Sequence, residues 1–161
     1  MNILTERLIL RNFNLGDMER FYHIIQDADI KRYLKGVYVK SKKALEENIK
    51  VYKNADFKND YYYVIEDKES GTMLGAIIAT RTCGNDIEVT YLTGRMYRGN
   101  KYMTEALEAF IKHVKRYNAG MKLLFSVEKD NIPSLKIMQK LGIRLTRKDK
   151  KRFYFITYGG I

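Results

Sequence analysis

The sequence predicts a mixed α/β (α+β) domain with a central, twisted, mostly antiparallel sheet of six to seven strands and about four flanking helices. Short apolar runs separated by tight turns fill the first half of the chain, and amphipathic helical repeats separate the later runs. A chain of 161 residues with 45% hydrophobic content can bury one sizeable core. No linker divides the chain, and Pro133 is its only proline. We therefore expect residues 1–161 to form a single domain.

The first half of the chain predicts a strand, two helices and a hairpin. Residues 8–13 are typical of an opening strand. Asp17 and Ser41 are suitable N-caps, and the apolar residues after each recur at helical spacing, which predicts a helix from both positions. Two apolar runs at 61–65 and 73–79, joined by a short polar turn, predict a hairpin of buried strands.

Helices separate the strands of the second half. We expect, in order, a strand at 87–93, an amphipathic helix from Met103 to Tyr117, a strand at 123–127, a short helix from Pro133 to Lys140, and strands at 144–147 and 153–158. Proline suits a helix start, and Gly142 can end that short helix. The strand, helix and strand over 87–127 imply one parallel step in an otherwise antiparallel sheet.

The positive charge is concentrated in the second half. Residues 1–80 hold 13 Lys and Arg against 12 Asp and Glu, whereas residues 81–161 hold 17 against 7. A one-sided basic field attracts nucleic acid, anionic lipid or a phosphorylated cofactor, although an ordinary lysine-rich surface gives the same charge. The chain contains no apolar run of about 18 residues, so we expect no membrane-spanning segment. The first residues lack the layout of a secretory signal. These features favour a cytoplasmic location.

Cysteine and histidine give no sign of a metal site. Cys83 is the only cysteine, so the chain cannot form an intramolecular disulfide or a multi-cysteine site. We expect Cys83 to be a strand thiol rather than a nucleophile. His23 and His113 lie far apart without a cysteine partner, so we expect no bound metal.

The segment 94–101 joins the expected strand at 87–93 to the long amphipathic helix. A loop that leads into a helix N-terminus presents unpaired N–H groups and the positive end of the helix dipole, which together favour an anion. Arg98 and Lys101 add positive charge, and Gly99 allows close backbone approach. By spacing alone, an ordinary strand-to-helix loop would look the same.

Three segments of the chain match one known family. They are Thr5-Glu6-Arg7-Leu8-Ile9-Leu10-Arg11, then Glu88-Val89-Thr90-Tyr91-Leu92 with the stretch 97–107, and Asn131-Ile132-Pro133-Ser134 continuing to 143. In this order they closely resemble the GNAT N-acetyltransferase superfamily, and best its branch of Rim-type ribosomal-protein N-acetyltransferases. The resemblance covers nearly the whole chain and implies a GNAT-like fold. It also implies an acyl-CoA-dependent N-acetyltransferase in which a primary amine attacks acetyl-CoA directly in a ternary complex.

The resemblance also implies where the cofactor binds. It points to Leu92, Thr93, Arg98, Gly99, Asn100, Lys101, Tyr102, Met103, Thr104 and Asn131. The backbone of Leu92 and Thr93 would bond the pantetheine amides, and Asn131 would bond the pantetheine arm. In the family's phosphate loop, Arg/Gln-x-x-Gly-x-Gly/Ala, Lys101 stands where glycine is expected and Met103 where glycine or alanine is expected. If position 101 requires a positive φ, a lysine there costs roughly 1–2 kcal/mol.

Acyl transfer to an amine requires a neutral amine, a polarised thioester carbonyl, an acid for the departing thiolate and correct positioning. The resemblance suggests Glu88 as the base and Ser134 as the donor to the departing sulfur, since Met138 replaces the tyrosine that many relatives use. From the residues alone, Glu88 could equally be a strand-edge carboxylate paired with a lysine. Ser134 could equally be a hydroxyl that caps its helix.

Two other functions remain open at this stage. The altered phosphate loop is also compatible with a catalytically weak module that binds CoA or another anion. The run 144–152 holds six basic residues and one acidic residue, which suits a nucleic-acid-binding protein, although a solvated turn is simpler. For an acetyltransferase, the acceptor is a protein N-terminal α-amine or a small-molecule amine, and the excess of positive charge disfavours a polybasic acceptor. The sequence leaves open a homodimer and an acyl group longer than acetyl.

Overall fold

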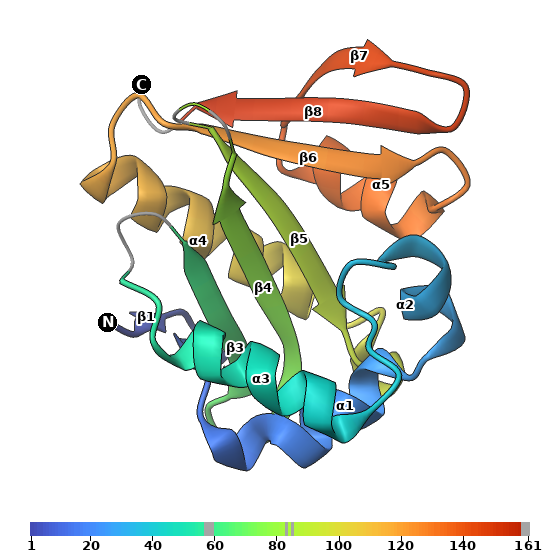
Figure 1. Cartoon of the computed structure of the whole chain (residues 1–161). Helices are drawn as coiled ribbons and strands as arrows, with labels where there is room; N and C mark the ends of the chain where they lie inside the picture. The colour runs from blue at the N-terminus through green and yellow to red at the C-terminus, as the bar shows by residue number, and fades with distance from the viewer. Residues whose placement is uncertain (57–59, 83, 85, 159–161) are drawn as a thin grey trace.

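The computed structural model of the protein describes residues 1–56, 60–82, 84 and 86–158, and within them one sheet carries helices on both faces (Figure 1). The sheet has eight strands in the order β1-β2-β3-β4-β5-β6-β8-β7. The strands are β1 (Ile3–Leu4), β2 (Leu8–Asn12), β3 (Tyr61–Asp67), β4 (Met73–Arg81), β5 (Ile87–Thr93), β6 (Lys122–Glu128), β7 (Arg144–Lys148) and β8 (Arg152–Tyr158). The α-helices are α1 (Met18–Ile25), α2 (Ala28–Tyr33), α3 (Lys42–Lys53), α4 (Tyr102–Tyr117) and α5 (Ile132–Lys140).

The described residues contain one strand and one helix more than we expected from the sequence. The additional strand, β1, is two residues long and pairs with Leu10 and Ile9 of β2, so it is too short to show an alternating pattern. The additional helix, α2, has six residues, too few for a helical repeat, and its N-cap Asp27 accepts a hydrogen bond from the Asp29 N–H at 2.9 Å. The remaining elements lie where the sequence predicted them.

The sheet is antiparallel except at one step, as predicted. β5 and β6 are parallel, and they pair only at Ile87 with Leu123 and at Glu88 with Leu124. Beyond Glu88 the two strands diverge (Figure 1), whereas β5 stays paired with β4 along its whole length. The backbone of the second half of β5 therefore has no neighbouring strand on its β6 side, and a gap opens between β5 and β6.

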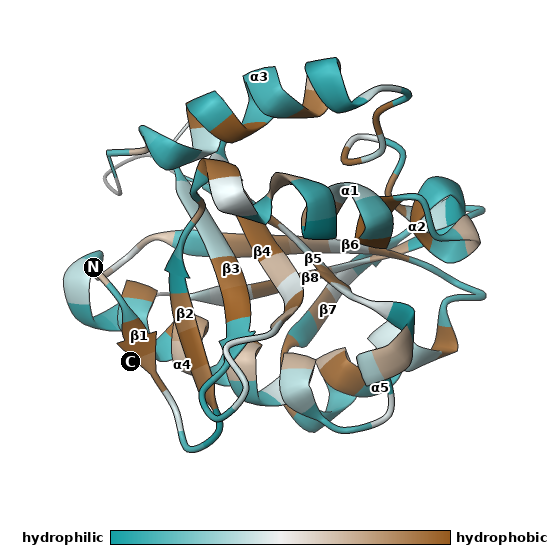
Figure 2. Cartoon of the chain, turned by 90° about the horizontal axis from the view of Figure 1, so that it is seen from below, coloured by the Kyte–Doolittle hydropathy of each residue, from teal (hydrophilic) through white to brown (hydrophobic). Residues whose placement is uncertain are grey.

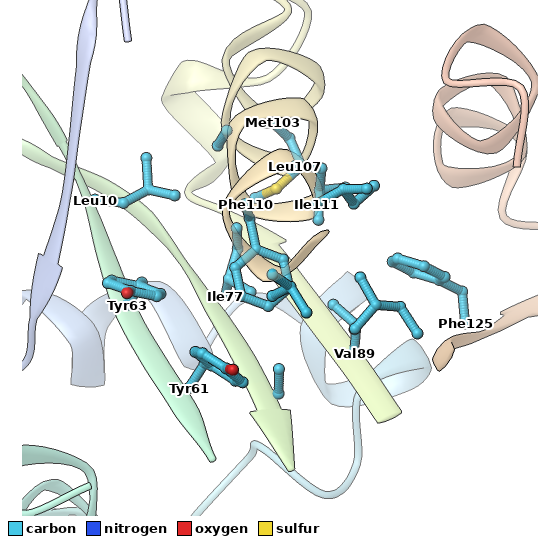
Figure 3. Close-up of a cluster of buried hydrophobic side chains, with 14 of the residues drawn as sticks. Leu10, Tyr61, Tyr63, Ile77, Val89, Met103, Leu107, Phe110, Ile111 and Phe125 are labelled. Carbon is cyan, nitrogen blue, oxygen red and sulfur yellow. The ribbon is translucent and has the colours of Figure 1, made fainter. Parts of the chain in front are cut away.

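The core has two layers, one on each face of the sheet (Figure 2). On one face, Met103, Leu107, Phe110 and Ile111 of α4 point at the strands (Figure 3). On the other face, α1 and α3 pack against β3, β4 and the end of β5. Successive tyrosines of β3 face opposite layers and are all buried, so this tyrosine run packs into the core, in keeping with the buried strand predicted at 61–65.

Local capping follows the sequence at some helix ends and not at others. The Ser41 hydroxyl accepts the Ala44 N–H at 3.2 Å and caps α3, and Gly142, with φ 63°, follows α5, as predicted. The prediction that the Asp17 side chain caps α1 was wrong. Asp17 precedes α1 but makes no cap bond, because its buried carboxylate accepts two bonds from Arg11 at 2.9 and 2.7 Å and one from the Asn14 N–H at 2.8 Å. These bonds raise the pKa of Arg11 above its ordinary value.

Cys83, expected to be a strand thiol, lies outside the described residues. Across the described parts of the chain, no helix has both the length and the apolar character needed to cross a bilayer.

Candidate active site

A cavity of about 1230 Å³ opens where β5 and β6 diverge. It is lined by β5, the loop before α4, the first turn of α4, α5 and the segment around α2. Of the residues expected from the sequence, those that line it are Glu88, Leu92, Thr93, Arg98, Gly99, Lys101, Tyr102, Met103, Thr104, Asn131 and Ser134. Asn100 does not line it. The Asn100 side chain instead donates to the carbonyls of Tyr97 and Arg98 at 3.2 and 3.3 Å and so holds the loop in shape.

Two of the last three residues of the loop before α4 have positive φ. Gly99 has φ 82° and Lys101 has φ 63°, and Lys101 is the only non-glycine residue with positive φ among those described. The expected requirement for positive φ at position 101 is thus met by a lysine. Lys101 occupies the N-cap of α4 without a side-chain cap bond, so the N–H groups of the first turn have no side-chain acceptor there. This sixteen-residue helix therefore directs free donors and the positive end of its dipole at the cavity.

The Arg98 side chain is bonded within the protein. Its guanidinium donates to Asp29 at 2.8 Å, to Asp27 at 3.0 Å and to the Thr93 carbonyl at 3.2 Å. Burial alone would raise the pKa of Asp27, but the hydrogen bond from Arg98 and the backbone N–H of Asp29 lower it below its ordinary value. Arg98 therefore ties the loop before α4 to the start of α2, whereas Lys101 forms no ion pair within the described residues.

The start of α5 places two expected residues beside a buried tyrosine. The Asn131 side chain accepts the Ser134 N–H at 3.4 Å, so Asn131 and not the Ser134 hydroxyl caps α5. The hydroxyl of Tyr91, on β5, is buried and has no hydrogen bond of ordinary geometry within the described chain. Burial raises the pKa of Tyr91 to about 12, and the neighbouring Ser134 hydroxyl opposes that rise. Tyr91 was not predicted as a site residue, although strand alternation places it on the face of β5 opposite Glu88 and Thr90, toward α5.

Glu88 occupies the last position at which β5 and β6 pair. Its side chain is exposed, and within the described residues it forms neither a hydrogen bond nor an ion pair. The structure therefore does not support the alternative in which Glu88 pairs with a lysine at the strand edge. An unpaired carboxylate at the mouth of the gap can accept a proton from a group that enters the cavity.

The far wall of the cavity comes from elements that are distant in the sequence. Tyr33 and the segment 34–37 follow α2, and Tyr52 of α3 stacks on Tyr62 of β3 with ring centroids 4.4 Å apart. Burial raises the pKa of Tyr52 above its ordinary value. Because no local spacing connects these residues, the sequence offered no pattern that grouped them. Among the described residues, no cluster of three or more His, Cys, Asp and Glu side chains could hold a metal ion.

Comparison with known proteins identifies the family. The acetyltransferase (GNAT) domain family matches residues 7–144. The chain is 24% identical to the uncharacterised N-acetyltransferase YnaD of Bacillus subtilis (strain 168), over 89% of this chain and 83% of that protein.

Solved structures have the same fold. A GNAT-family acetyltransferase from Bacillus anthracis superposes with a TM-score of 0.87 at 20% identity, over 99% of both chains. RimL, a ribosomal L7/L12 alpha-N-protein acetyltransferase solved in complex with coenzyme A, gives a TM-score of 0.86 at 14% identity over 98% of both chains. The cavity between β5 and β6, the free donors at the start of α4 and the match over 7–144 lead to one identification: the chain belongs to the GNAT acetyltransferase family and is an acyl-CoA-dependent acetyltransferase.

Proposed function

We propose that the protein transfers an acetyl group from acetyl-CoA to a primary amine by direct attack in a ternary complex. The observation that carries this proposal is the position of Glu88. It is an unpaired carboxylate at the point where β5 and β6 diverge, in the same cavity as the uncapped start of α4. A proton acceptor and an anion site thus open into one space, as a two-substrate transfer requires.

The residues around the gap suit the cofactor. The N–H groups of Tyr102, Met103 and Thr104 lie in the first turn of α4 and are suited to bind its diphosphate, with Gly99 allowing close approach. The second half of β5, which lacks a strand partner on one side, is suited to bond the pantetheine amides through Leu92 and Thr93. Acetyl-CoA would supply the activated acetyl group, and the protein would hold it in line with the incoming amine.

The proton transfers follow from the same geometry. Glu88, directly or through one water, accepts a proton from the ammonium or from the amine as the N–C bond forms. As the C–S bond breaks, the departing thiolate takes a proton from the Ser134 hydroxyl beside Tyr91, and water restores that proton as Glu88 gives up its own. The products are an amide and free CoA. Burial raises the pKa of Tyr91 further above neutrality, so its hydroxyl stays protonated beside Ser134.

A Glu88→Gln variant tests this proposal. Since the amide cannot accept a proton, we expect turnover at neutral pH to fall by about 100-fold or more. The affinity for acetyl-CoA, measured by isothermal titration, should stay within about twofold, because Glu88 stands apart from the phosphate loop. Glu69→Gln, which removes an exposed carboxylate from the β3–β4 turn, is the matched control and should behave as the unmodified protein.

An unchanged rate in the Glu88 variant would remove Glu88 from the mechanism. The absence of heat in an isothermal titration with millimolar acetyl-CoA would refute the proposed function. A second candidate, a catalytically weak CoA-binding regulatory module, is favoured by one observation: lysine in place of glycine at a positive-φ position of the phosphate loop. CoA binding without acetyl transfer to any peptide or small amine would support that candidate.

A further inference from the structure

The left-handed backbone of Lys101 is surrounded by contacts from the start of the chain. A non-glycine residue keeps such a backbone only where its surroundings fix it. β1 and β2 pack beside α4 (Figure 2). Arg7 lies in the turn between these two strands and bonds Glu105 of α4, which is 98 positions away in the chain. The turn therefore lies against the point where the loop becomes α4.

Arg7 fixes the peptide group that joins Asn100 to Lys101. Its guanidinium donates from Nη1 to the Asn100 carbonyl oxygen at 3.1 Å. The same guanidinium lies over the Tyr102 ring, with Cζ 4.4 Å from the ring centroid. Because a peptide group is planar, a fixed Asn100 carbonyl also fixes the Lys101 N–H on the opposite side. Arg7 thus contacts the residue before Lys101 and the residue after it.

Glu105 holds the guanidinium of Arg7 in this position. One carboxylate oxygen accepts Arg7 Nε at 2.7 Å and lies 2.7 Å from Arg7 Nη2. The other oxygen accepts the Thr5 hydroxyl at 2.6 Å and the Arg7 backbone N–H at 2.9 Å. Burial alone would raise the pKa of Glu105, but these bonds lower it below its ordinary value. The Glu105 N–H in turn donates to the Lys101 carbonyl at 3.1 Å, so the carbonyls on both sides of Lys101 are bonded by Arg7 or Glu105.

This clamp of Thr5, Arg7 and Glu105 stands outside the cavity. None of its three residues lines the cavity, whereas Lys101 and Tyr102 do. Arg7 and Glu105 also neutralise each other, so a carboxylate in the first turn of α4 does not compete with an anion for the helix dipole. The clamp therefore acts on a ligand of the loop through the position of the loop, and not through direct contact.

A second arginine of the same part of the sheet has similar bonds without touching the loop. Arg11, on β2, donates to Glu66 at 2.6 Å and to Asp17 at 2.9 and 2.7 Å. Neither Arg11 nor its two partners line the cavity. Arg11 thus ties elements of the fold together far from Lys101, and it provides an internal comparison for Arg7.

We infer that Arg7 is a positioning residue for the cofactor. Through Glu105 and the Asn100 carbonyl it holds Lys101 in the left-handed conformation, and so keeps the donors of the loop arranged for the diphosphate of acetyl-CoA. This inference rests on the proposed function for the identity of the anion. The affinity of a site falls with the fraction of molecules in the binding conformation. A loop without the clamp leaves that conformation in most molecules, so CoA binds more weakly although every group that touches it is still present.

Arginine-to-lysine changes test the inference by binding, independently of turnover. Lysine keeps the charge of Arg7 but lacks the fork that reaches Glu105 and the Asn100 carbonyl together. In isothermal titration with CoA, Arg7→Lys should bind about tenfold more weakly than the unmodified protein. Arg11→Lys is the matched control. It should lower the melting temperature at least as much, because it disturbs the buried Asp17, while CoA affinity stays within about twofold.

Combining Arg7→Lys with changes at Lys101 tests the route of the effect. Lys101→Ala and Lys101→Gly both lack the ammonium group, and only alanine keeps the strain of the left-handed backbone. Arg7→Lys should weaken CoA binding about tenfold in the alanine background and about threefold or less in the glycine background. An equal loss in both backgrounds would show that Arg7 does not act by holding this conformation, and would overturn the inference.

The outcomes separate this inference from the proposed function. Unchanged CoA affinity in Arg7→Lys, or an equal loss in Arg11→Lys, would overturn the inference and leave the proposed function standing. Weaker CoA binding confined to Arg7→Lys, in a protein that acetylates no amine, would support the clamp and reject the proposed function. If the unmodified protein gives no heat with CoA, both are refuted.

Discussion

Replacing Lys101 by glycine tests whether the phosphate loop carries backbone strain. Lys101 has φ 63° and ψ 10°, a left-handed conformation, at the N-cap of α4. Its carbonyl accepts the first bond of the helix, from the Glu105 N–H at 3.1 Å, so the conformation is fixed by the start of α4. In this region an L-residue brings its Cβ too close to the backbone, and glycine does not.

The size of the effect follows from two opposing contributions. The left-handed conformation costs a non-glycine residue roughly 1–2 kcal/mol. Glycine loses more backbone entropy on folding, about 0.5–1 kcal/mol. We therefore expect the glycine variant to be about 0.5–1 kcal/mol more stable than a Lys101→Ala variant, which keeps the strain and also lacks the ammonium group. For a domain of this size the difference corresponds to about 1–4 °C in melting temperature.

Urea unfolding of the two variants at neutral pH measures this difference directly. A glycine variant that is no more stable than the alanine variant would refute the strain. Both variants lose the charge, so both should bind CoA more weakly and with a shallower dependence on salt, if the Lys101 ammonium lies near the cofactor phosphates. Unchanged CoA affinity in both would show that the ammonium contributes nothing there.

Two further changes probe the sheet and the long helix. In Gly75→Ala the new Cβ would lie 2.1 Å from the Leu92 carbonyl oxygen, so β4 and β5 must separate, and we expect a loss of about 3 kcal/mol or more in the free energy of unfolding measured with urea. A loss below about 1 kcal/mol would contradict the close approach. His113 lies half-buried on α4 against Tyr63, and burial lowers its pKa below the ordinary value. The unfolded chain therefore binds more protons at His113 than the folded chain does. The contribution of neutral His113 to the free energy of unfolding is complete above about pH 6.5 and is lost as the pH falls below that value. His113→Gln should flatten the fall in stability between about pH 7 and pH 5, while His23→Gln, which removes an exposed histidine, serves as the control; equal slopes in both variants would contradict the prediction.

Most of the element order follows from the sequence alone. Strands β3 to β6 and helices α3 to α5 follow from apolar spacing, because a strand or helix buries residues at a fixed period that neighbours along the chain already display. The Ser41 cap and the parallel step between β5 and β6 are equally local. The family's loop pattern raised a positive φ at position 101 only as a condition, and the structure shows that this condition holds.

The sequence did not predict the shortest elements or the bonding partner of Asp17. β1 and α2 are too short to establish a period. Asp17 suited an N-cap by its residue type, but Arg11 takes its carboxylate in the folded chain. The residues next to Asp17 in the chain do not determine whether its carboxylate bonds the helix N–H groups or a distant arginine.

The assembly of the site depends on contacts between segments that are distant in the chain. Arg98 bonds Asp27 and Asp29, about 70 positions earlier in the chain, which leaves the backbone donors of α4 and Lys101 for an anion. The divergence of β5 from β6 brings Glu88 to the mouth of the cavity. The run 144–152, a plain basic stretch in the sequence, is divided by strand alternation between the two faces of the sheet, and two of its arginines, Arg147 and Arg152, line a hollow together with Glu88. The sequence contained the charges and the local elements, whereas the contacts between distant segments decided which of those charges share a space, because pairing across the sheet joins residues that no local period connects.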